Sequence, residues 1–415
     1  MKSKSKSIIK FGLFSLIQLI TQLLGLLTNI IITNKVSVEE YGIYSIILVF
    51  IGLIMTIGFS WTSSMVSFYG SKEIVINGNM SRTLKGRNVL LLISTSLTFL
   101  VFLLAHDAIN SFIGYEFSLL IFFWVVIKAL HEYLAYYFIA REKKIISSTV
   151  GLVVRASTVI TLLVLNVDLK FVLIISILCE ILALISIIFV DKDDFKSTRL
   201  DKPYFKEISA FALWQLIGSV AIYIINFSNN FFIKHFHSSF EVGLFNSAFI
   251  LFNGLFIFSN VISSFYVATV SRYFQESNVE SIRYFFYRIR LLLFGLALIG
   301  HVILFIFSEA IIHFMFPIDY IGAVPVLKYL LVASLCRYWS VFYMLYLNIN
   351  KMHHIQQYLN VITAIVIVLL NLFLIPSYGV VGAAIATSST ILLQTIISSL
   401  ICEPRIKYYV VMRGS

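Results

Sequence analysis

The chain has 415 residues, of which 60% are hydrophobic and only 12% are charged, and its mean hydropathy is +0.95. Because a soluble domain carries about 25% charged residues, this composition excludes a protein whose surface faces mainly water. The formal net charge of +11 does not indicate nucleic-acid binding, since no connection is long enough to hold a folded basic module.

Long apolar runs dominate the chain. Each is continuous over about 20 residues, which predicts membrane-spanning helices and not the short alternating strands of a membrane barrel. We expect an all-α integral membrane protein with about twelve spans, six in each half. In chain order the spans cover about 8–32, 42–69, 88–105, 117–139, 145–165, 171–190, 208–233, 242–270, 288–308, 321–348, 355–375 and 379–402.

The distribution of Lys and Arg predicts the orientation. Both termini and the connections after every second span hold 24 of these residues, counting those at the starts of the first and ninth spans. The other connections hold only Lys35, Lys170 and Lys234. Positive charge concentrates on the cytoplasmic side, so both termini are expected in the cytoplasm. The same basic face suits anionic lipid headgroups.

The charged connection 191–207 lies at the midpoint and contains Pro203. It predicts two six-helix lobes, 1–206 and 207–415. A shift of 201 residues places 29–45 over 230–246, with identities that include Ser37 with Ser238 and Glu40 with Glu241. Each half has an even number of spans, so the halves are interpreted as a parallel repeat whose pseudo-axis follows the membrane normal.

A few ionisable residues fall inside the predicted spans. An ionisable group at this depth costs several kcal/mol, so it usually faces a partner, the bundle interior or a water-filled cavity. Four cations stand against two acids, and this surplus predicts an anionic guest. The candidate substrate-binding cations are Lys128, Arg155, Arg337 and Lys328.

Structural alternatives exist for these charges. Lys128 and Glu132 lie four residues apart, so they could form a salt bridge on one helix. Arg155 and Glu180 could pair across adjacent helices, and Lys328 could cap backbone carbonyls or reach toward the interface. The functional alternative is a role in ion coupling or charge balance, for which the candidates are His131, Glu132 and Glu180.

Amide side chains recur along the first, seventh and eighth spans. In lipid they need hydrogen-bond partners, which neighbouring helices or a hydrated cavity can supply. The residues predicted to line a polar cavity are Gln18, Gln22, Asn29, Asn226, Asn230, Asn246 and Asn253.

No pattern of catalytic or metal-binding residues stands out. The three cysteines lack metal-ligand spacing, and there is no nucleotide-binding loop or Ser/His/Asp pattern. We therefore expect neither an enzyme nor a cofactor or metal.

Three motifs carry a resemblance to a known family. They are VSVEEYGIYS at 36–45, its echo FEVGLFNSAF at 240–249, and IPSYGVVGAAIATSST at 375–390. With twelve spans, they resemble the polysaccharide-export branch of the multidrug/oligosaccharidyl-lipid/polysaccharide (MOP) flippase superfamily, in particular the O-antigen flippases of the Wzx type.

The resemblance implies two lobes around a central cavity that work by alternating access. It implies a polyprenyl-pyrophosphate-linked oligosaccharide as substrate, moved between leaflets of the bacterial cytoplasmic (inner) membrane for lipopolysaccharide or other polysaccharide biosynthesis. A cationic lumen would be formed by Lys128, Arg155 and Arg337, with Lys328 as an additional candidate. Other polysaccharide-assembly membrane proteins are candidate partners, and H⁺ or Na⁺ is a candidate coupling ion.

Two other functions stay open at this stage. A drug or organic-cation antiporter of the same superfamily is disfavoured by the positive charge inside the spans. A membrane glycan polymerase or ligase would need catalytic residues on a large outer loop, and the predicted outer loops are short.

Overall fold

The computed structural model describes residues 2–195 and 200–412, with side chains over 12–195 and 200–411. The regular elements in these ranges are all helical, and no strand occurs among them. The chain divides into two compact units, Met1–Tyr223 and Ile224–Ser415. The boundary falls inside the long helix α10 (Lys202–Phe236).

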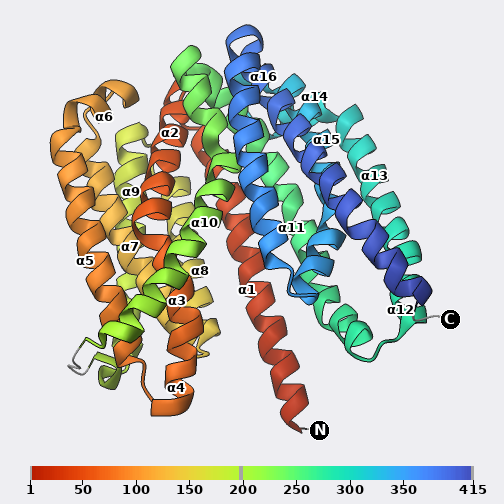
Figure 1. The fold of residues 1–415 in the computed structure, drawn as a ribbon. Coiled ribbons are helices and arrows are strands. Elements are labelled where there is room, and N and C mark those ends of the chain that lie inside the picture. Colours follow the sequence, from red (N-terminus) through yellow and green to blue (C-terminus); the bar gives the residue numbers. More distant parts are fainter. Residues whose placement is uncertain (1, 196–199, 413–415) are drawn as a thin grey trace. The chain divides into compact units, whose positions relative to one another are not determined.

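Unit 1 is built from a series of long helices joined by short connections (Figure 1). Its second span is a continuous helical run whose winding changes several times between α2 and α4. The elements are α1 (Lys2–Thr33), α2 (Val38–Ile54), η1 (Met55–Phe59), η2 (Ser60–Thr62), α3 (Ser63–Met65), η3 (Val66–Gly70), α4 (Ser71–Asn77), α5 (Ser81–Leu104), α6 (His106–Ile113), α7 (Ser118–Ala140), α8 (Lys144–Val164), α9 (Leu169–Ile181), η4 (Leu182–Phe189) and η5 (Lys192–Phe195).

Unit 2 follows from the second part of α10. Its elements are α11 (Ser239–Gln275), α12 (Val279–Tyr284), η6 (Phe285–Ile289), α13 (Arg290–Ile306), α14 (Ser308–Met315), η7 (Ile318–Tyr320), α15 (Ala323–Ile349) and α16 (His353–Met412). Within it, α15 packs against α11, α13 and α16.

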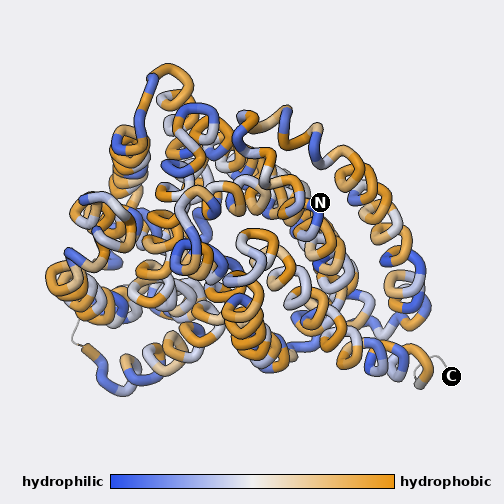
Figure 2. The backbone as a smooth tube through the Cα atoms, turned by 90° about the horizontal axis from the view of Figure 1, so that it is seen from above, coloured by the Kyte–Doolittle hydropathy of each residue, from blue (hydrophilic) through white to orange (hydrophobic). Residues whose placement is uncertain are grey.

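The predicted spans are confirmed. Eleven helices in the described ranges are long and apolar enough to cross a membrane, and the last of them extends over His353–Val411. This last helix is interrupted at Gly379, so it holds the eleventh and twelfth predicted spans. Hydrophobic residues predominate along the helical tubes (Figure 2). Many large apolar side chains are exposed, such as Leu104 at 75% and Phe265 at 70%, as lipid-facing surfaces require.

Gly379 reverses the chain direction within α16 (Figure 1). Its φ of 56° and ψ of −136° are close to the first central position of a type II′ turn, which favours glycine. A Cβ at this position would also lie 2.8 Å from Oε2 of Glu241. Both the backbone conformation and the lack of space for a Cβ therefore explain why the motif IPSYG has glycine at position 379.

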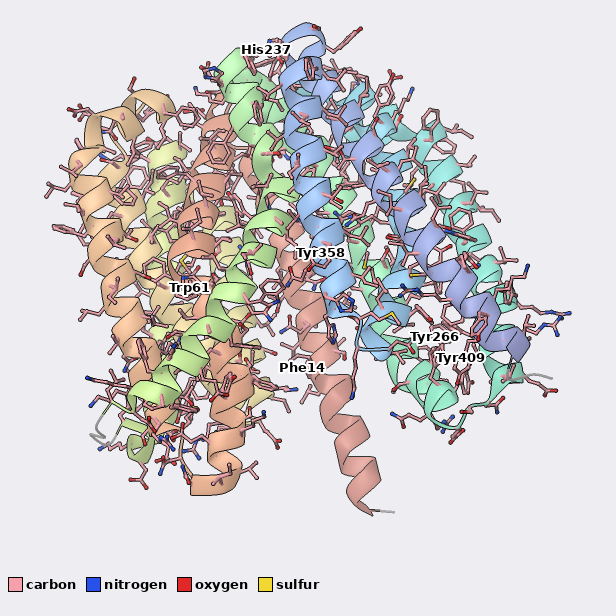
Figure 3. The ribbon with its side chains drawn as sticks, viewed as in Figure 1. Phe14, Trp61, His237, Tyr266, Tyr358 and Tyr409 are labelled. Atoms are coloured by element: carbon pink, nitrogen blue, oxygen red, sulfur yellow. The ribbon has the colours of Figure 1, made fainter. Side chains whose placement is uncertain are left out.

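Helix capping explains part of the internal repeat. Ser37 caps α2 in a complete capping box with Glu40, and Ser238 caps α11 by accepting a hydrogen bond from the Glu241 backbone N–H at 3.3 Å. Such caps satisfy N–H groups that the helix leaves unpaired. In unit 2 the Glu241 carboxylate lies near His237 instead, with 3.5 Å between Oε1 and Nδ1. His237, labelled in Figure 3, also contacts the Ile375 carbonyl oxygen through Nε2 at 2.8 Å.

A buried carboxylate organises the predicted cytoplasmic end of unit 1. Asp194 is fully buried and accepts hydrogen bonds from Met80 N at 2.9 Å, Tyr137 Oη at 2.7 Å and Arg141 Nε at 2.8 Å. The bond to Asp194 raises the pKa of Arg141 above its ordinary value. Asp194 belongs to the predicted connection 191–207, of which residues 196–199 lie outside the described ranges. The start of this connection is thus anchored to unit 1.

Candidate functional site

Lys128 lies near the middle of α7, half-buried, and it forms no direct ion pair or hydrogen bond with the described residues. The carboxylates of Glu180 and Glu132 act on it only at longer range. The alternative of an ion pair between Lys128 and Glu132 is not formed. A cation in a membrane-spanning helix without a fixed partner is costly, and such groups usually meet a ligand or a water-filled space.

The Glu132 carboxylate is held by serines of the second span. Ser60 Oγ donates to Glu132 Oε2 at 2.7 Å, and Ser63 Oγ donates to Oε1 at 2.9 Å. Ser60 lies in η2 and Ser63 opens α3, where the helix changes its winding after the π-helical turn η1. Such local changes of winding often occur at functional sites, because they turn side chains out of the regular helical register.

Arg87 completes this cluster, and the sequence prediction missed it. Arg87 Nη2 donates to Ser63 Oγ at 3.0 Å, and the guanidinium lies 4.5 Å from the centre of the Tyr133 ring. The charge count from the sequence assigned Arg87 to a cytoplasmic connection. In the structure it lies inside α5, and its side chain is only 2% exposed. Its face of α5 continues through Ser94 and Thr98, which are also buried. Polar residues seven and eleven positions after Arg87 share its helix face, and this spacing could have indicated from the sequence that the face is buried.

His131 and Glu180 form an ion pair across α7 and α9, between Nδ1 and Oε1. Their side chains are 19% and 15% exposed. The direct pairing of Glu180 with Arg155, considered from the sequence, is not formed, and Arg155 acts on Glu180 only at longer range. Arg155 is instead exposed on α8 and has no ion-pair partner among the described residues.

In unit 2, Arg337 lies in the middle of α15 against aromatic and amide groups. Its guanidinium carbon is 4.4 Å from the centre of the Phe256 ring, and Nη2 is 3.5 Å from Asn226 Oδ1. Its buried Nε has no hydrogen-bond partner. Lys328 faces another helix, with Nζ 5.5 Å from the centre of the Phe305 ring. The two cations thus lie on different sides of α15.

A second buried arginine was also missed. Arg290, at the start of α13, is 4% exposed, forms a 2.6 Å ion pair with Glu403 and lies 4.4 Å from the centre of the Trp339 ring. Tyr343 Oη donates to the same carboxylate at 2.8 Å. His301, eleven residues later on the same face, is buried too, so the spacing signal resembles that of Arg87. Each unit therefore holds a buried arginine against an aromatic ring near its predicted cytoplasmic side.

The predicted amide residues divide into four groups. Gln18 donates to Ser148 across α1 and α8 at 3.0 Å, and Asn246 donates to the buried Asn230 across α11 and α10. Asn29 donates to the Gly25 carbonyl within α1 at 2.8 Å. Gln22 and Asn253 are exposed. Asn226 accepts from Arg337, as given above.

The cations, and not a catalytic group, are the chemically distinctive feature of both units. No cluster of His, Cys, Asp or Glu in the described ranges could hold a metal ion. Guanidinium and ammonium groups bind phosphate through charge-assisted hydrogen bonds, and arginine can do so in a bidentate manner. The arrangement is therefore suited to binding an anion.

Comparisons with solved structures show the fold. The inward-facing conformation of a multidrug resistance MATE family transporter of the MOP superfamily matches with a TM-score of 0.73 at 14% identity, covering 94% of this chain and 95% of that one. The lipid II flippase MurJ in an inward closed conformation matches with a TM-score of 0.73 at 15% identity, covering 97% and 90%.

A third solved structure is a MOP superfamily transporter from Pyrococcus furiosus, described by the reverse polarity of its binding pocket. It has a TM-score of 0.58 at 13% identity and covers 96% of this chain and 95% of that one. No curated protein matches the chain. At these identities the structural matches establish the MOP superfamily fold and no specific activity.

The family follows from the sequence match. The family model described as "Polysaccharide biosynthesis protein" matches residues 9–274, which is more than half of the chain. The match includes the first two motifs of the predicted resemblance. The chain therefore belongs to the polysaccharide biosynthesis protein family, and it has the fold of the MOP superfamily.

Proposed function

We propose that this chain moves an undecaprenyl-pyrophosphate-linked oligosaccharide, such as an O-antigen or other surface-polysaccharide repeat unit, from the inner to the outer leaflet of the bacterial cytoplasmic membrane. Transport would proceed by alternating access, without enzymatic chemistry. Membership of a polysaccharide biosynthesis family supports this substrate class. The fold is shared with MurJ, which is named as a lipid II flippase.

The observation that carries the proposal is the presence of embedded cations that form no direct ion pair. Lys128 in unit 1 and Arg337 in unit 2 both lie in the middle of a spanning helix, and neither is in direct contact with a carboxylate in the described ranges. Glu180 and Glu132 act on Lys128 at longer range. A pyrophosphate would supply the missing negative charge, while exposed amides such as Gln22 and Asn253 would contact sugar hydroxyls. Arg155, exposed on α8, and Lys328 would add to the positive field.

Ion coupling would use the titratable groups next to Lys128. His131, Glu132 and Glu180 are held by hydrogen bonds or an ion pair within unit 1. Protonation of either carboxylate would weaken its present contacts and raise the local positive charge. H⁺ is the coupling ion that these groups suit best, and Na⁺ is the alternative.

A drug or organic-cation antiporter is the second candidate, because several structures with the same fold are multidrug MATE transporters. A cationic guest would need an unpaired carboxylate. In the described part of unit 1, Glu132 and Glu180 are instead bound by serines and by His131, which favours the lipid-linked anion.

Deletion of the gene would test the proposal. The leaflet that holds the lipid-linked repeat unit is then measured with a membrane-impermeant enzyme or lectin. We expect the repeat unit to accumulate on the cytoplasmic side, and wild-type chain supplied in trans should restore export. Normal export with unpolymerised product outside would point to a polymerase. Unchanged export and polymerisation would exclude both functions.

A further inference from the structure

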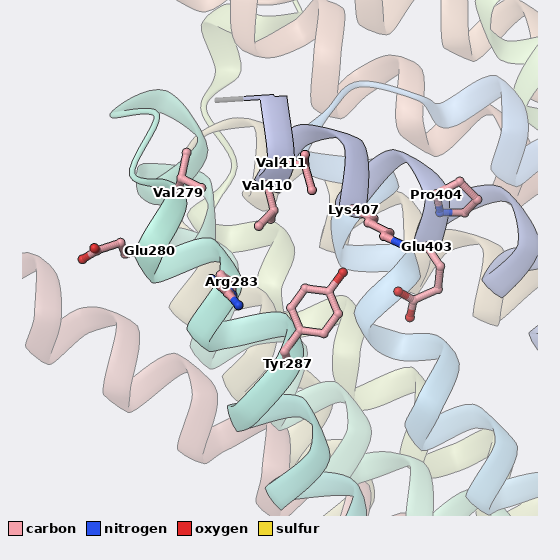
Figure 4. Close-up of a pocket in the computed structure, with 9 residues that line it drawn as sticks. All are labelled: Val279, Glu280, Arg283, Tyr287, Glu403, Pro404, Lys407, Val410 and Val411. Carbon is pink, nitrogen blue, oxygen red and sulfur yellow. The ribbon is translucent and has the colours of Figure 1, made fainter. Parts of the chain in front are cut away.

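A pocket of about 1170 Å³ opens in unit 2 between the α12–η6 segment and the last part of α16. Figure 4 shows its lining residues, which come from these two segments alone. The connection before α12 and the end of α16 both belong to the predicted cytoplasmic side. Neither embedded cation, Lys128 or Arg337, is among the residues that line this pocket. The lining residues are Val279, Glu280, Arg283, Tyr287, Glu403, Pro404, Lys407, Val410 and Val411.

The available charge in the pocket is positive. Arg283 and Lys407 are exposed, and neither has an ion-pair partner among the described residues. Of the two acids, Glu403 is already bound by Arg290 at 2.6 Å and by Tyr343 Oη at 2.8 Å. The Glu280 side chain points away from the other lining residues (Figure 4). A guest of negative charge would therefore meet two cations without ion-pair partners, and of the two lining acids only Glu280 is not held by another described group.

The surroundings of the pocket suit a lipid better than a soluble anion. Each cation is followed in sequence by an exposed tyrosine, Tyr284 at 57% and Tyr408 at 64%, as is typical of the membrane interface. Deeper along the same helical runs, Leu291 and Leu400 are 53% and 70% exposed. An exposed apolar surface thus continues from the pocket into the membrane-spanning part of unit 2, where acyl chains can lie.

We infer that this pocket binds the phosphate headgroup of an anionic phospholipid of the cytoplasmic leaflet. Arg283 and Lys407 would contact the phosphate oxygens, and Tyr287 would offer a hydroxyl donor. Basic pockets on the cytoplasmic side of transmembrane helices are known to bind anionic headgroups. The inference does not depend on which substrate the chain transports.

Native mass spectrometry of the full chain, equilibrated with equal amounts of phosphatidylglycerol and phosphatidylethanolamine, tests the inference. The readout is the ratio of the two retained lipids. We expect wild-type chain to prefer phosphatidylglycerol, and Arg283→Gln with Lys407→Gln to lower the ratio by about tenfold. The conservative Lys407→Arg should keep it. The matched control is Arg288→Gln with Lys351→Gln, which removes two exposed cations of unit 2 that do not line the pocket.

Several outcomes would overturn the inference. An equal preference for both lipids in wild-type chain would do so, as would an equal fall in the control. A soluble-anion site would appear as loss of bound phosphatidylglycerol when inorganic phosphate is added at millimolar concentration. Lipid retention is measured without transport, so the two tests are independent. A negative result for lipid retention would not count against the proposed flippase function, and a negative result for transport would not count against this lipid site.

Discussion

His131 and Glu180 pair across α7 and α9, and Lys128, one turn before His131 on α7, forms no direct ion pair in the described ranges. Glu132, the other acid nearby on α7, is bound by Ser60 and Ser63. Both acids near Lys128 thus make their direct contacts with other groups, and they act on Lys128 only at longer range. This arrangement is the reason to expect an anionic guest at Lys128.

Replacing Lys128 by alanine should impair transport without unfolding the chain. A hydrogen bond to a charged group contributes about 1.5–3 kcal/mol, so the loss should lower the transport rate at limiting substrate by about tenfold or more. Lys128→Arg should retain a large part of the activity. The rate is measured by complementation of a deletion strain, with membrane insertion checked by thermal unfolding in detergent.

Lys170→Ala is the matched control, because Lys170 is exposed at the start of α9. It should leave the rate unchanged. Full complementation by Lys128→Ala and by Arg337→Ala would remove the support for substrate-binding cations.

Glu180→Gln tests the coupling role of the pair with His131. The amide keeps the shape of the carboxylate and can still accept a hydrogen bond, but it cannot exchange a proton. We expect transport to lose its stimulation by a pH gradient across the membrane. The measurement compares initial rates in vesicles with and without the gradient. Stimulation equal to that of wild-type chain would show that the pair is only structural.

Asp194→Asn should destabilise the predicted cytoplasmic end of unit 1. It removes the closer of the two carboxylates that pair with Arg141, which keeps Asp191 at 3.4 Å. Loss of a hydrogen bond to a charged group typically costs about 1.5–3 kcal/mol. Thermal unfolding should shift downward, whereas Asp107→Asn, at an exposed position, should have little effect.

The pH dependence of this effect follows from Arg141. The Asp194 bond raises the pKa of Arg141, so the stabilisation by its charge is present below the unfolded value and is lost only as pH rises through the folded value. Both values lie far above neutral pH. The difference between wild-type and Asp194→Asn chains should therefore stay constant from about pH 7 to pH 9. A difference that shrinks over this interval would contradict the assigned ion pair.

Gly379→Ala should destabilise the turn within α16. A residue with a side chain is strained at this φ and ψ, at a cost of about 1–3 kcal/mol, and its Cβ would press on Glu241. Gly151→Ala in α8 is the control, because its Cβ would meet nothing within 4 Å. We expect a lower unfolding temperature for the first variant and an unchanged or higher one for the second. Equal temperatures would argue against the turn geometry.

The spans could be predicted from the sequence because continuous hydrophobicity fixes them directly. The break between the last two predicted spans, near 375–379, could also be predicted from the sequence. The dependence of this turn on Gly379 became clear only from the backbone angles. The pairing of His131 with Glu180 could not be predicted, since it depends on how α7 and α9 are rotated against each other. The sequence offered Arg155 as an equally good partner.

Arg87 and Arg290 were missed for a related reason. Both stand at the start of a span, next to other basic residues, where a count of charge assigns them to the water-exposed connections. Their burial depends on aromatic and hydroxyl groups from other helices, such as Tyr133 for Arg87 and Trp339 for Arg290. Polar residues spaced by seven or eleven positions on the same helix were the local hint.

Reconstitution of the purified chain tests the central claim most directly. Proteoliposomes carry a fluorescent polyprenyl-pyrophosphate-linked oligosaccharide, and the fraction accessible to a membrane-impermeant quencher is followed over time. We predict that wild-type chain exchanges the lipid between leaflets, and that Lys128→Ala with Arg337→Ala exchanges it at least tenfold more slowly, on the order expected for a lost charged contact. Exchange no faster than in protein-free vesicles, or equal rates for both chains, would contradict the account.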